Sequence, residues 1–264
     1  MNNPQEKLSL VGHHALVCGA SRGIGRAAAE LLAARGAEVT LMARDAQLLD
    51  EVVEGIVNAG GKAVSAVADF DDLGVLEKIV DDLAAKGGID IVINNSGGPP
   101  GGPLLDADID AMRHALSRHL FAGHLLVQKL LPGMRARGYG RFVNILSTSV
   151  REPIPNLGVS NLTRAAVASW AKTISTEMPP GVTINNILPG FTDTDRLTSL
   201  AEGIAERSGA TVDEVRKGWI EQIPEGRLAD ASETAEAIAF LVSPAAAYIR
   251  GHSLPVDGGR MRSI

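Results

Sequence analysis

The sequence is poor in cysteine, in aromatic residues and in long apolar runs. One cysteine among 264 residues excludes a disulfide within the chain. No apolar run is long enough to span a bilayer, and the polar start Met1–Lys7 lacks the apolar core of a signal peptide. The net charge is −6, and no run of lysine or arginine forms a basic stripe, which argues against a nucleic-acid partner. We therefore expect a soluble, cytoplasmic protein that binds neither membrane nor nucleic acid.

Small and aliphatic residues are what the chain has in abundance. Hydrophobic residues make up 45% of it although aromatic residues make up only 3%. This mixture suits helices that pack closely on a parallel sheet. Cys18 lies in one of the apolar segments, so we interpret it as a buried, inert thiol rather than a reactive one.

Short apolar runs alternate with helical patterns along the whole sequence. The alternation predicts an α/β fold with a doubly wound, mostly parallel sheet of about seven strands and helices on both faces. The strands are expected at residues 14–18, 38–43, 63–67, 89–94, 141–146, 182–188 and 253–256. We find neither an internal repeat nor a linker, so residues 1–264 are expected to form one domain, with a polar helical insert at about 195–225.

A glycine-rich turn follows the first predicted strand and opens a helix of about 23–35. The glycines permit a tight turn and a close approach of backbone to phosphate. The helix N-terminus supplies free N–H groups and the positive end of the helix dipole. Glycine turns are common at such junctions, but a strand before and a helix after predict nucleotide binding. The expected binding residues are Gly19, Ser21, Arg22, Gly23, Ile24 and Gly25.

The Gly-x-x-x-Gly-x-Gly spacing of this turn resembles the short-chain dehydrogenase/reductase family, in particular its 3-oxoacyl-ACP reductase-like members. Three later segments agree: Asn94–Gly97, Pro189–Thr194 and Val256–Gly259 resemble the family's Asn-Asn-Ala-Gly, Pro-Gly and C-terminal motifs. The resemblance covers nearly the whole chain and implies a Rossmann-type fold and an oxidoreductase that uses a nicotinamide nucleotide. The further cofactor-binding residues that it implies are Asp69, Phe70, Asn95, Gly97, Pro189, Gly190, Thr192 and Thr194.

The end of the second strand indicates which nicotinamide nucleotide is bound. An acidic residue there would bind the ribose hydroxyls and repel a 2′-phosphate. The sequence has Ala43 followed by Arg44 instead, and Arg22 lies in the glycine turn. Two guanidinium groups near one ribose suit a phosphate, so we predict NADP(H) rather than NAD(H). In the alternative, Arg44 is a solvated surface residue paired with Asp45.

The resemblance also implies four catalytic positions, and only Ser147 keeps the family's residue. In the family, a serine after strand five holds the substrate oxygen, a tyrosine exchanges the proton, and a lysine four residues later binds the nicotinamide ribose. An asparagine on the preceding long helix supports a water relay. In this sequence the tyrosine falls on Ser160, the lysine on Arg164 and the asparagine on His119. The same Arg164 is expected to take over the ribose contact.

Neither of the two tyrosines is expected to replace the missing one. Tyr139 falls in the turn before the fifth strand, away from the cleft, and Tyr248 follows the late helix. A phenol has a pKa of about 10, whereas the aliphatic hydroxyl of Ser160 is a far weaker acid. The sequence therefore predicts an altered route for the proton.

Two routes remain open. A water held between Ser147, Ser160 and Arg164 could deliver the proton, although Arg164 itself stays protonated. His119 could deliver it directly, since imidazole titrates near neutrality. In the alternative, His119 is a hydrogen-bonded residue of the interior. Three residues close after Ser147 are alternative lining residues of the pocket: Ser149, Arg151 and Glu152.

The remaining features concern metal, substrate and assembly. His114, His119 and His124 are spaced by five along one helix, which spreads them around it, so we predict no metal site. The insert at 195–225 corresponds to the family's lid over a small-molecule substrate, and its charges are interpreted as solvated. The predicted helix 109–137 and the helix after Gly158 match the family's dimer interface, which implies a homodimer or homotetramer. Two functions stay open: an NADP(H)-dependent carbonyl or alcohol oxidoreductase, and an NADP(H)-binding sensor or assembly partner with little turnover.

Overall fold

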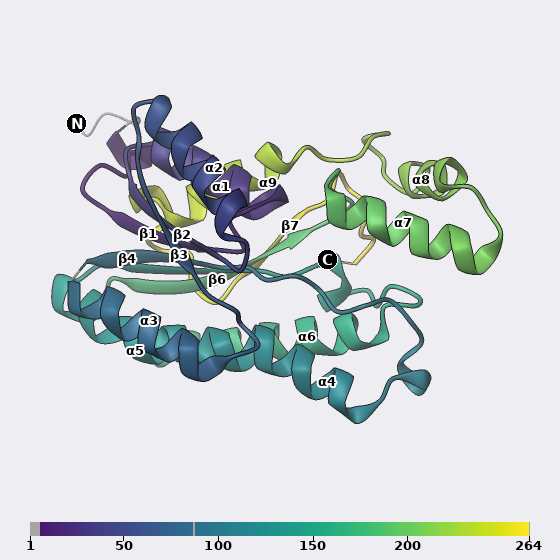
Figure 1. Cartoon of the computed structure of the whole chain (residues 1–264), viewed down its shortest axis with the longest axis horizontal. Coiled ribbons are helices and arrows are strands. Elements are labelled where there is room, and N and C mark those ends of the chain that lie inside the picture. Colours follow the sequence, from purple (N-terminus) through teal and green to yellow (C-terminus); the bar gives the residue numbers. More distant parts are fainter. Residues whose placement is uncertain (1–5, 87, 264) are drawn as a thin grey trace.

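The computed structural model describes residues 6–86 and 88–263, and in this part of the chain a seven-stranded sheet lies between two layers of helices (Figure 1). The strand order is β3-β2-β1-β4-β5-β6-β7, and every neighbouring pair is parallel. This is the predicted Rossmann-type, doubly wound sheet. The strands are β1 (His14–Cys18), β2 (Glu38–Ala43), β3 (Lys62–Val67), β4 (Ile89–Asn94), β5 (Gly140–Ile145), β6 (Val182–Pro189) and β7 (Ser253–Val256).

Helices cover both faces of the sheet, as Figure 1 shows. On one face lie α1 (Gly23–Ala34), α2 (Ala46–Asn58) and α9 (Ala231–Val242). On the other lie α3 (Leu73–Lys86), α4 (Ile109–Leu116), α5 (Ala122–Arg137) and α6 (Gly158–Ser175). Short 3-10 turns occupy Glu6–Leu8, Leu104–Asp106, Thr148–Val150 and Pro244–Ala246.

Strand β1 shows why two helical layers are needed. Successive side chains of a strand point to opposite faces. Ala15 and Val17 belong to the apolar cluster under α1, α2 and α9, whereas Leu16 and Cys18 belong to the cluster over α3, α5 and α6. Both faces of the strand are thus apolar and must be covered. The thiol of Cys18 is fully buried, and burial raises its pKa to about 12, which agrees with an inert thiol.

The strand order reverses between β1 and β4. The connection from β3 returns to the other side of β1, so the chain segments that leave the carboxyl ends of β1 and β4 lie side by side. Asn95, just after β4, donates a hydrogen bond from Nδ2 to the carbonyl oxygen of Gly19 at 3.4 Å. Open α/β sheets bind ligands in the crevice at such a reversal.

The predicted helix over 109–137 is interrupted once. Between α4 and α5 the segment Ser117–Phe121 forms a π-helical turn. A single π turn inside an α-helix rotates the residues on either side of it and is frequent at functional sites. Here the turn places His119 in the interior, beside the chain that leaves β4.

The predicted insert forms two helices beyond the end of the sheet, α7 (Asp195–Ser208) and α8 (Val212–Ile220) (Figure 1). They share a small apolar cluster around Leu197, Ala201 and Trp219, and the Trp219 ring stacks on Phe191 at 5.1 Å. The core of the insert is thus separate from the two clusters of the sheet. Among the described residues, no helix combines the length and the apolar character that crossing a membrane requires.

Candidate active site and cofactor pocket

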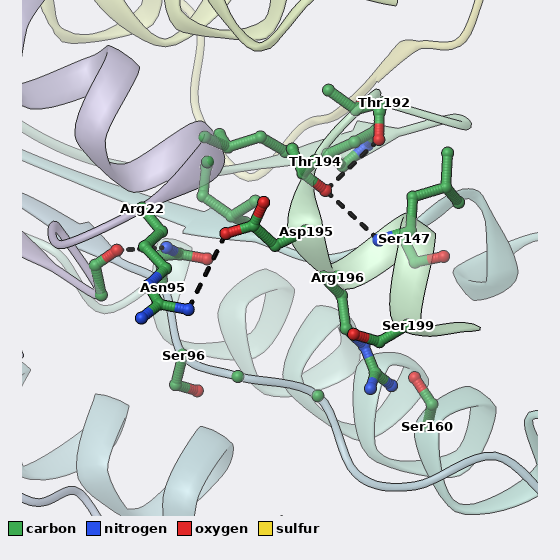
Figure 2. Close-up of a pocket in the computed structure, with 18 of the residues that line it drawn as sticks. Arg22, Asn95, Ser96, Ser147, Ser160, Thr192, Thr194, Asp195, Arg196 and Ser199 are labelled. Atoms are coloured by element: carbon green, nitrogen blue, oxygen red, sulfur yellow. Dashed lines mark hydrogen bonds and ion pairs between the residues drawn. The ribbon is translucent and has the colours of Figure 1, made fainter. Parts of the chain in front are cut away.

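A pocket of about 690 Å³ opens at the carboxyl ends of the central strands (Figure 2). Its walls come from the glycine turn, the ends of β2 and β3, the loop after β4, the end of β5, the start of α6 and the segment from β6 into α7. The predicted residues that line it are Gly19, Ser21, Arg22, Gly23, Ile24, Arg44, Asp69, Phe70, Asn95, Gly97, Ser147, Ser160, Arg164, Pro189, Gly190, Thr192 and Thr194. The structure thus brings two distant parts of the sequence, around residues 19–25 and 147–164, to one pocket.

The glycine turn is shaped by backbone. Gly19 and Gly23 have φ values of +60° and +53°, a region that favours glycine. A Cβ on Gly25 would lie 2.1 Å from the carbonyl oxygen of Gly19, so only glycine lets α1 begin so close to the turn. Gly25 is not among the residues that line the pocket: it packs the start of α1 against the turn, and its contact with a cofactor stays a prediction.

The start of α1 presents its free N–H groups to this turn. The N-cap residue Arg22 makes no side-chain hydrogen bond to the first turn of the helix. A helix N-terminus with uncapped N–H groups binds anions such as a pyrophosphate. The glycine cradle and the helix end therefore fit a dinucleotide.

The other end of the cradle carries positive side chains. Arg44 lines the pocket after Ala43, and its Nη1 lies 3.9 Å from an oxygen of Asp69. Asp45 caps α2 by accepting from the N–H of Leu48 at 3.2 Å, and the carboxylate beside Arg44 is that of Asp69 rather than the suggested Asp45. Both Arg44 and Asp69 are largely exposed, and exposed ion pairs stabilise little. Arg44 is therefore free to turn toward a ligand phosphate.

Arg22, in the glycine turn, also has a weak contact with a carboxylate. Its Nη1 is 3.8 Å from Asp195, in the first turn of α7 (Figure 2). This long, exposed contact joins the glycine turn to the insert. An anion placed near Arg22 would therefore have only a weak contact to replace.

Ser147, Ser160 and Arg164 all line this pocket. Ser147 follows β5, and its Oγ accepts from the N–H of Ser149 at 3.0 Å. Ser160 and Arg164 stand one turn apart on α6, and both line the pocket. The Arg164 side chain is buried and donates from Nη1 to the carbonyl oxygen of Ile145 at 2.8 Å. Burial, with the nearby positive charge of Arg196, lowers the pKa of Arg164 to about 10, so it stays protonated at neutral pH.

His119 does not reach the pocket wall, which corrects its prediction as a direct proton donor. Its ring is 3% exposed, with Nδ1 2.6 Å from Ser96 Oγ, and Nε2 has no hydrogen-bond partner among the described residues. Burial, and then the positive charges of Arg164 and Arg118, lower its pKa to about 2. His119 is therefore a neutral residue of the interior, the alternative that the sequence left open.

The three alternative residues after Ser147 also turn away from the pocket. Arg151 donates to the carbonyl oxygen of Ser253 at 3.0 Å, and Glu152 accepts from the N–H of Ser263 at 2.7 Å. Ser149 is buried without lining the pocket. Arg151 and Glu152 instead hold the start of β7 and the C-terminal segment.

Neither tyrosine faces the pocket. Tyr139 stands at the amino end of β5, stacks on His13 at 4.1 Å and donates its hydroxyl to the carbonyl oxygen of Val242. Tyr248 is fully exposed. Over residues 6–86 and 88–263 the pocket therefore contains no phenol. Nor does this part of the chain hold three or more His, Cys, Asp or Glu residues grouped as a metal site.

Sequence reasoning missed two features of the site. Arg196, in the first turn of α7, reaches across the pocket and donates from Nη2 to the carbonyl oxygen of Pro99 at 2.6 Å. Its charge was interpreted as solvated because it lies in a polar, charge-balanced insert. Figure 2 shows Arg196 and Ser199 of α7 on the side of the pocket where Ser160 of α6 lies.

The second missed feature is a chain of amides beneath the pocket. Asn94 donates to Asn144 at 2.9 Å, Asn144 to Asn186 at 2.9 Å, and Asn186 to Ser253 Oγ at 3.0 Å. The parallel register aligns these residues across β4, β5, β6 and β7. The buried polar groups satisfy one another and hold together the strand ends that carry Asn95 and Ser147. In the sequence these residues lie far apart, and nothing in their local pattern marks them as neighbours.

The fold and the pocket define a dinucleotide-binding α/β protein, and comparison with known proteins specifies the family. Residues 19–260 match the family model described as Enoyl-(Acyl carrier protein) reductase. The chain is 36% identical over 256 residues to the 3-oxoacyl-[acyl-carrier-protein] reductase FabG of Vibrio cholerae, an alignment that covers 96% of this chain and 98% of the relative.

Solved structures agree. The L-sorbose reductase of Gluconobacter frateurii, complexed with NADPH and L-sorbose, superposes with a TM-score of 0.91 at 27% identity, covering 98% of this chain and 100% of the other. A 7α-hydroxysteroid dehydrogenase complexed with NADH superposes with a TM-score of 0.90 at 28% identity, covering 100% and 99%. The chain belongs to the short-chain dehydrogenase/reductase family, a family of NAD(P)-dependent oxidoreductases that act on small molecules.

Proposed function

We propose that this protein is an NADP(H)-dependent oxidoreductase that moves a hydride to or from a carbonyl or alcohol carbon, with proton delivery altered from that of its family. The observation that carries the proposal is the shared pocket. Ser147, Ser160 and Arg164 line the same space as the glycine turn. The bound nicotinamide would supply or accept the hydride, and the residues of this wall would hold the reacting oxygen.

The cofactor would lie from the glycine turn to Arg164. Its pyrophosphate would bind at Gly19–Gly25 and the N-terminus of α1, and Asp69 and Phe70 would contact the adenine. Relatives of the same fold are known with NADPH and with NADH, so the fold does not select between them. Ala43 with Arg44 and Arg22 supports NADP(H), because guanidinium groups bind a phosphate through paired hydrogen bonds.

Proton transfer would use water rather than a side-chain phenol. Ser147 would orient the substrate oxygen, and Arg164 would donate to the ribose hydroxyls while stabilising negative charge that develops on that oxygen. Because Arg164 keeps its proton and His119 is neutral and off the wall, a water between Ser147, Ser160 and Arg164 is the remaining donor. Ser160 is shorter than tyrosine by a ring, which leaves room for it.

Three further parts of the proposal concern architecture. Residues 1–264 would act as one dinucleotide-binding domain, and α7 and α8 would serve as the lid over a small-molecule substrate. A homodimer or homotetramer would form through α4–α6, where the exposed side chains of Ile109 and Phe121 support an apolar interface.

The same pocket residues, Ser147, Ser160 and Arg164, also support a second function. In the described pocket neither a phenol nor an imidazole can exchange a proton. An NADP(H)-binding protein with little or no turnover, acting as a sensor or assembly partner, would have this construction. It would keep the cofactor end and lose the proton donor.

The two functions are separated by NADPH oxidation measured against a panel of ketones, quinones and imines, alongside NADPH binding. Turnover of any of them supports the oxidoreductase, and tight binding without turnover across the panel supports the sensor. The double variant Ser160→Tyr with Arg164→Lys tests the positions themselves. We expect carbonyl reduction to rise at least about tenfold, since general acid catalysis contributes more than that.

The matched control is Glu54→Tyr with Asn58→Lys. These residues have the same spacing but are exposed on α2, away from the pocket and from α4–α6, so this variant should behave like the parent. A folded, NADPH-binding Ser160→Tyr/Arg164→Lys variant with no gain over the control would contradict the positional assignment.

A further inference from the structure

Two arginines meet at the substrate end of the pocket. They come from different elements, Arg164 from α6 and Arg196 from α7, and both lie against the loop after β4. The point where a Cβ on Gly98 would stand is 3.4 Å from Arg196 Nη2 and 3.7 Å from Arg164 Nη2. The Nη2 atoms of the two guanidinium groups therefore reach the same small region of the pocket wall.

This pair has no counter-charge in the described chain. The other arginines that line the pocket each face a carboxylate: Arg22 faces Asp195, Arg44 faces Asp69 and Arg118 faces Asp71. Within residues 6–86 and 88–263, Arg164 and Arg196 instead donate only to backbone carbonyls, of Ile145 and Pro99.

Such a pair is unfavourable by itself. Like charges in a partly desolvated site raise each other's free energy, and an anion between them relieves both. The pKa values agree with this: burial lowers that of Arg196, and the charge of Arg196 adds to the burial that lowers that of Arg164. A region built in this way is ready to receive negative charge.

The cofactor's own phosphates do not account for Arg196. In the proposed binding mode the pyrophosphate lies at the glycine turn, and the 2′-phosphate lies near Arg22 and Arg44. Figure 2 shows Arg196 and Ser199 on the side of the pocket where Ser160 lies. The apolar side chains of Ile154, Leu157 and Leu200 also line the pocket. The side where Ser160 lies is the substrate end.

We infer that the substrate is a small anionic carbonyl or alcohol compound, and that Arg196 is the residue that selects it by binding its charged group. Carboxylate and phosphate oxygens both match the guanidinium fork, so they are the two sources of charge to compare. Arg164 adds to the positive potential at this end of the pocket, and in the proposed binding mode it also donates to the ribose hydroxyls. This inference rests on the proposed function, because it concerns the substrate of the same site.

The test compares charged substrates with neutral ones of the same skeleton. NADPH oxidation is measured with 3-oxobutanoate against its methyl ester, and with dihydroxyacetone phosphate against dihydroxyacetone. We expect at least a tenfold higher kcat/KM for the anion in one of the two pairs. The pair that shows it identifies the carboxylate or the phosphate, and an equal or better neutral substrate in both pairs would overturn the inference.

Arg196→Gln should then raise KM for the preferred anion by ten- to a hundredfold and leave its neutral analogue within threefold. Arg196→Lys should restore part of the loss, because it returns the charge without the fork. Arg207→Gln, at the other end of α7, is the control and should match the parent. An equal loss for charged and neutral compounds in Arg196→Gln would show that Arg196 only ties α7 to Pro99, and the inference would fall.

A binding measurement separates this inference from the proposed function. The NADP⁺ complex is heated with 3-hydroxybutanoate, with glycerol 3-phosphate, and with the neutral 3-hydroxybutanamide and glycerol. If one anion alone stabilises the complex and Arg196→Gln abolishes the effect, the inference stands even where no compound is turned over. If neutral compounds are turned over and neither anion is preferred or bound, the oxidoreductase stands and the inference fails.

Discussion

The two halves of the pocket are built from different parts of the polypeptide. In the proposed cofactor half, the phosphate cradle is made of backbone, in the glycine turn and the N-terminus of α1, where an added Cβ on Gly19 or Gly25 would collide with neighbouring atoms. The catalytic half is made of side chains that stand on α6, α7 and the end of β5. A backbone cradle cannot change without changing the turn, whereas side chains on a helix can be replaced while the helix stays. Substitutions should therefore disturb the two halves of the pocket in different ways.

The largest expected effect comes from breaking the cofactor half. Gly25→Val places a side chain where even a Cβ would lie 2.1 Å from the carbonyl oxygen of Gly19, so the turn and the start of α1 must separate. We expect NADPH affinity to fall at least a hundredfold, about 2.7 kcal/mol, measured by the change in nucleotide fluorescence on binding.

The control for this variant is Gly55→Ala, inside α2, where an added Cβ meets no atom within 4 Å. It should bind NADPH like the parent and gain about 0.5–1 kcal/mol of stability, because alanine favours a helix. Unchanged NADPH affinity in a folded Gly25→Val protein would refute the backbone account of the cradle.

A smaller effect concerns the catalytic half and depends on pH. In the unfolded chain His119 takes a proton below its ordinary pKa of about 6.5, whereas in the folded protein its pKa is about 2. Between these values the unfolded chain binds one more proton. The free energy of unfolding contributed by His119 should thus fall as the pH drops, by up to about 1.4 kcal/mol per pH unit.

Urea unfolding of the parent and of His119→Asn between pH 7 and pH 5 measures this pH dependence of the free energy of unfolding. The parent should lose stability more steeply, since all other groups are shared. Parallel pH dependences in the two proteins would mean that His119 can be protonated in place and would reopen its role as a proton donor.

The smallest effect refines the cofactor half. Arg22→Gln with Arg44→Gln removes two exposed guanidinium groups that face weakly held carboxylates. We expect NADPH affinity to fall about tenfold, roughly 1.4 kcal/mol, while NADH affinity stays the same. Isothermal titration with both nucleotides measures the ratio, and an equal loss for both would assign these arginines to the pyrophosphate rather than to the 2′-phosphate.

Much of the fold was predictable because it follows from local pattern. Every predicted strand is present within a residue or two, since apolar runs of four to eight residues between helical patterns have few other solutions. The π turn at Ser117–Phe121 was not predicted, because it adds only about one residue to the helical repeat, which a short apolar pattern does not resolve. The amides of Asn94, Asn144 and Asn186 were missed for a related reason: only the strand register makes them neighbours.

The residues of the site likewise include some that local pattern predicts and some that only tertiary packing places. Ser160 and Arg164 could be placed on one face of a helix because residues four apart share a face. The burial of His119 could not be predicted, since it depends on α5 and on the chain after β4 packing around the ring. Arg196 could not be predicted either, because a charged side chain in a polar helix points to solvent unless another segment approaches it.

The sequence by itself determined the order of strands and helices, the glycine turn and the presence of serine at position 160, because each of these depends on residue type and short-range spacing. Tertiary structure alone decided which charges are left without a partner. The free energy of a charge depends on what lies within a few ångströms of it in space. Thus Arg22, Arg44 and Arg118 face carboxylates, Arg164 and Arg196 reach the same part of the pocket wall near Gly98, and His119 is held neutral in the interior.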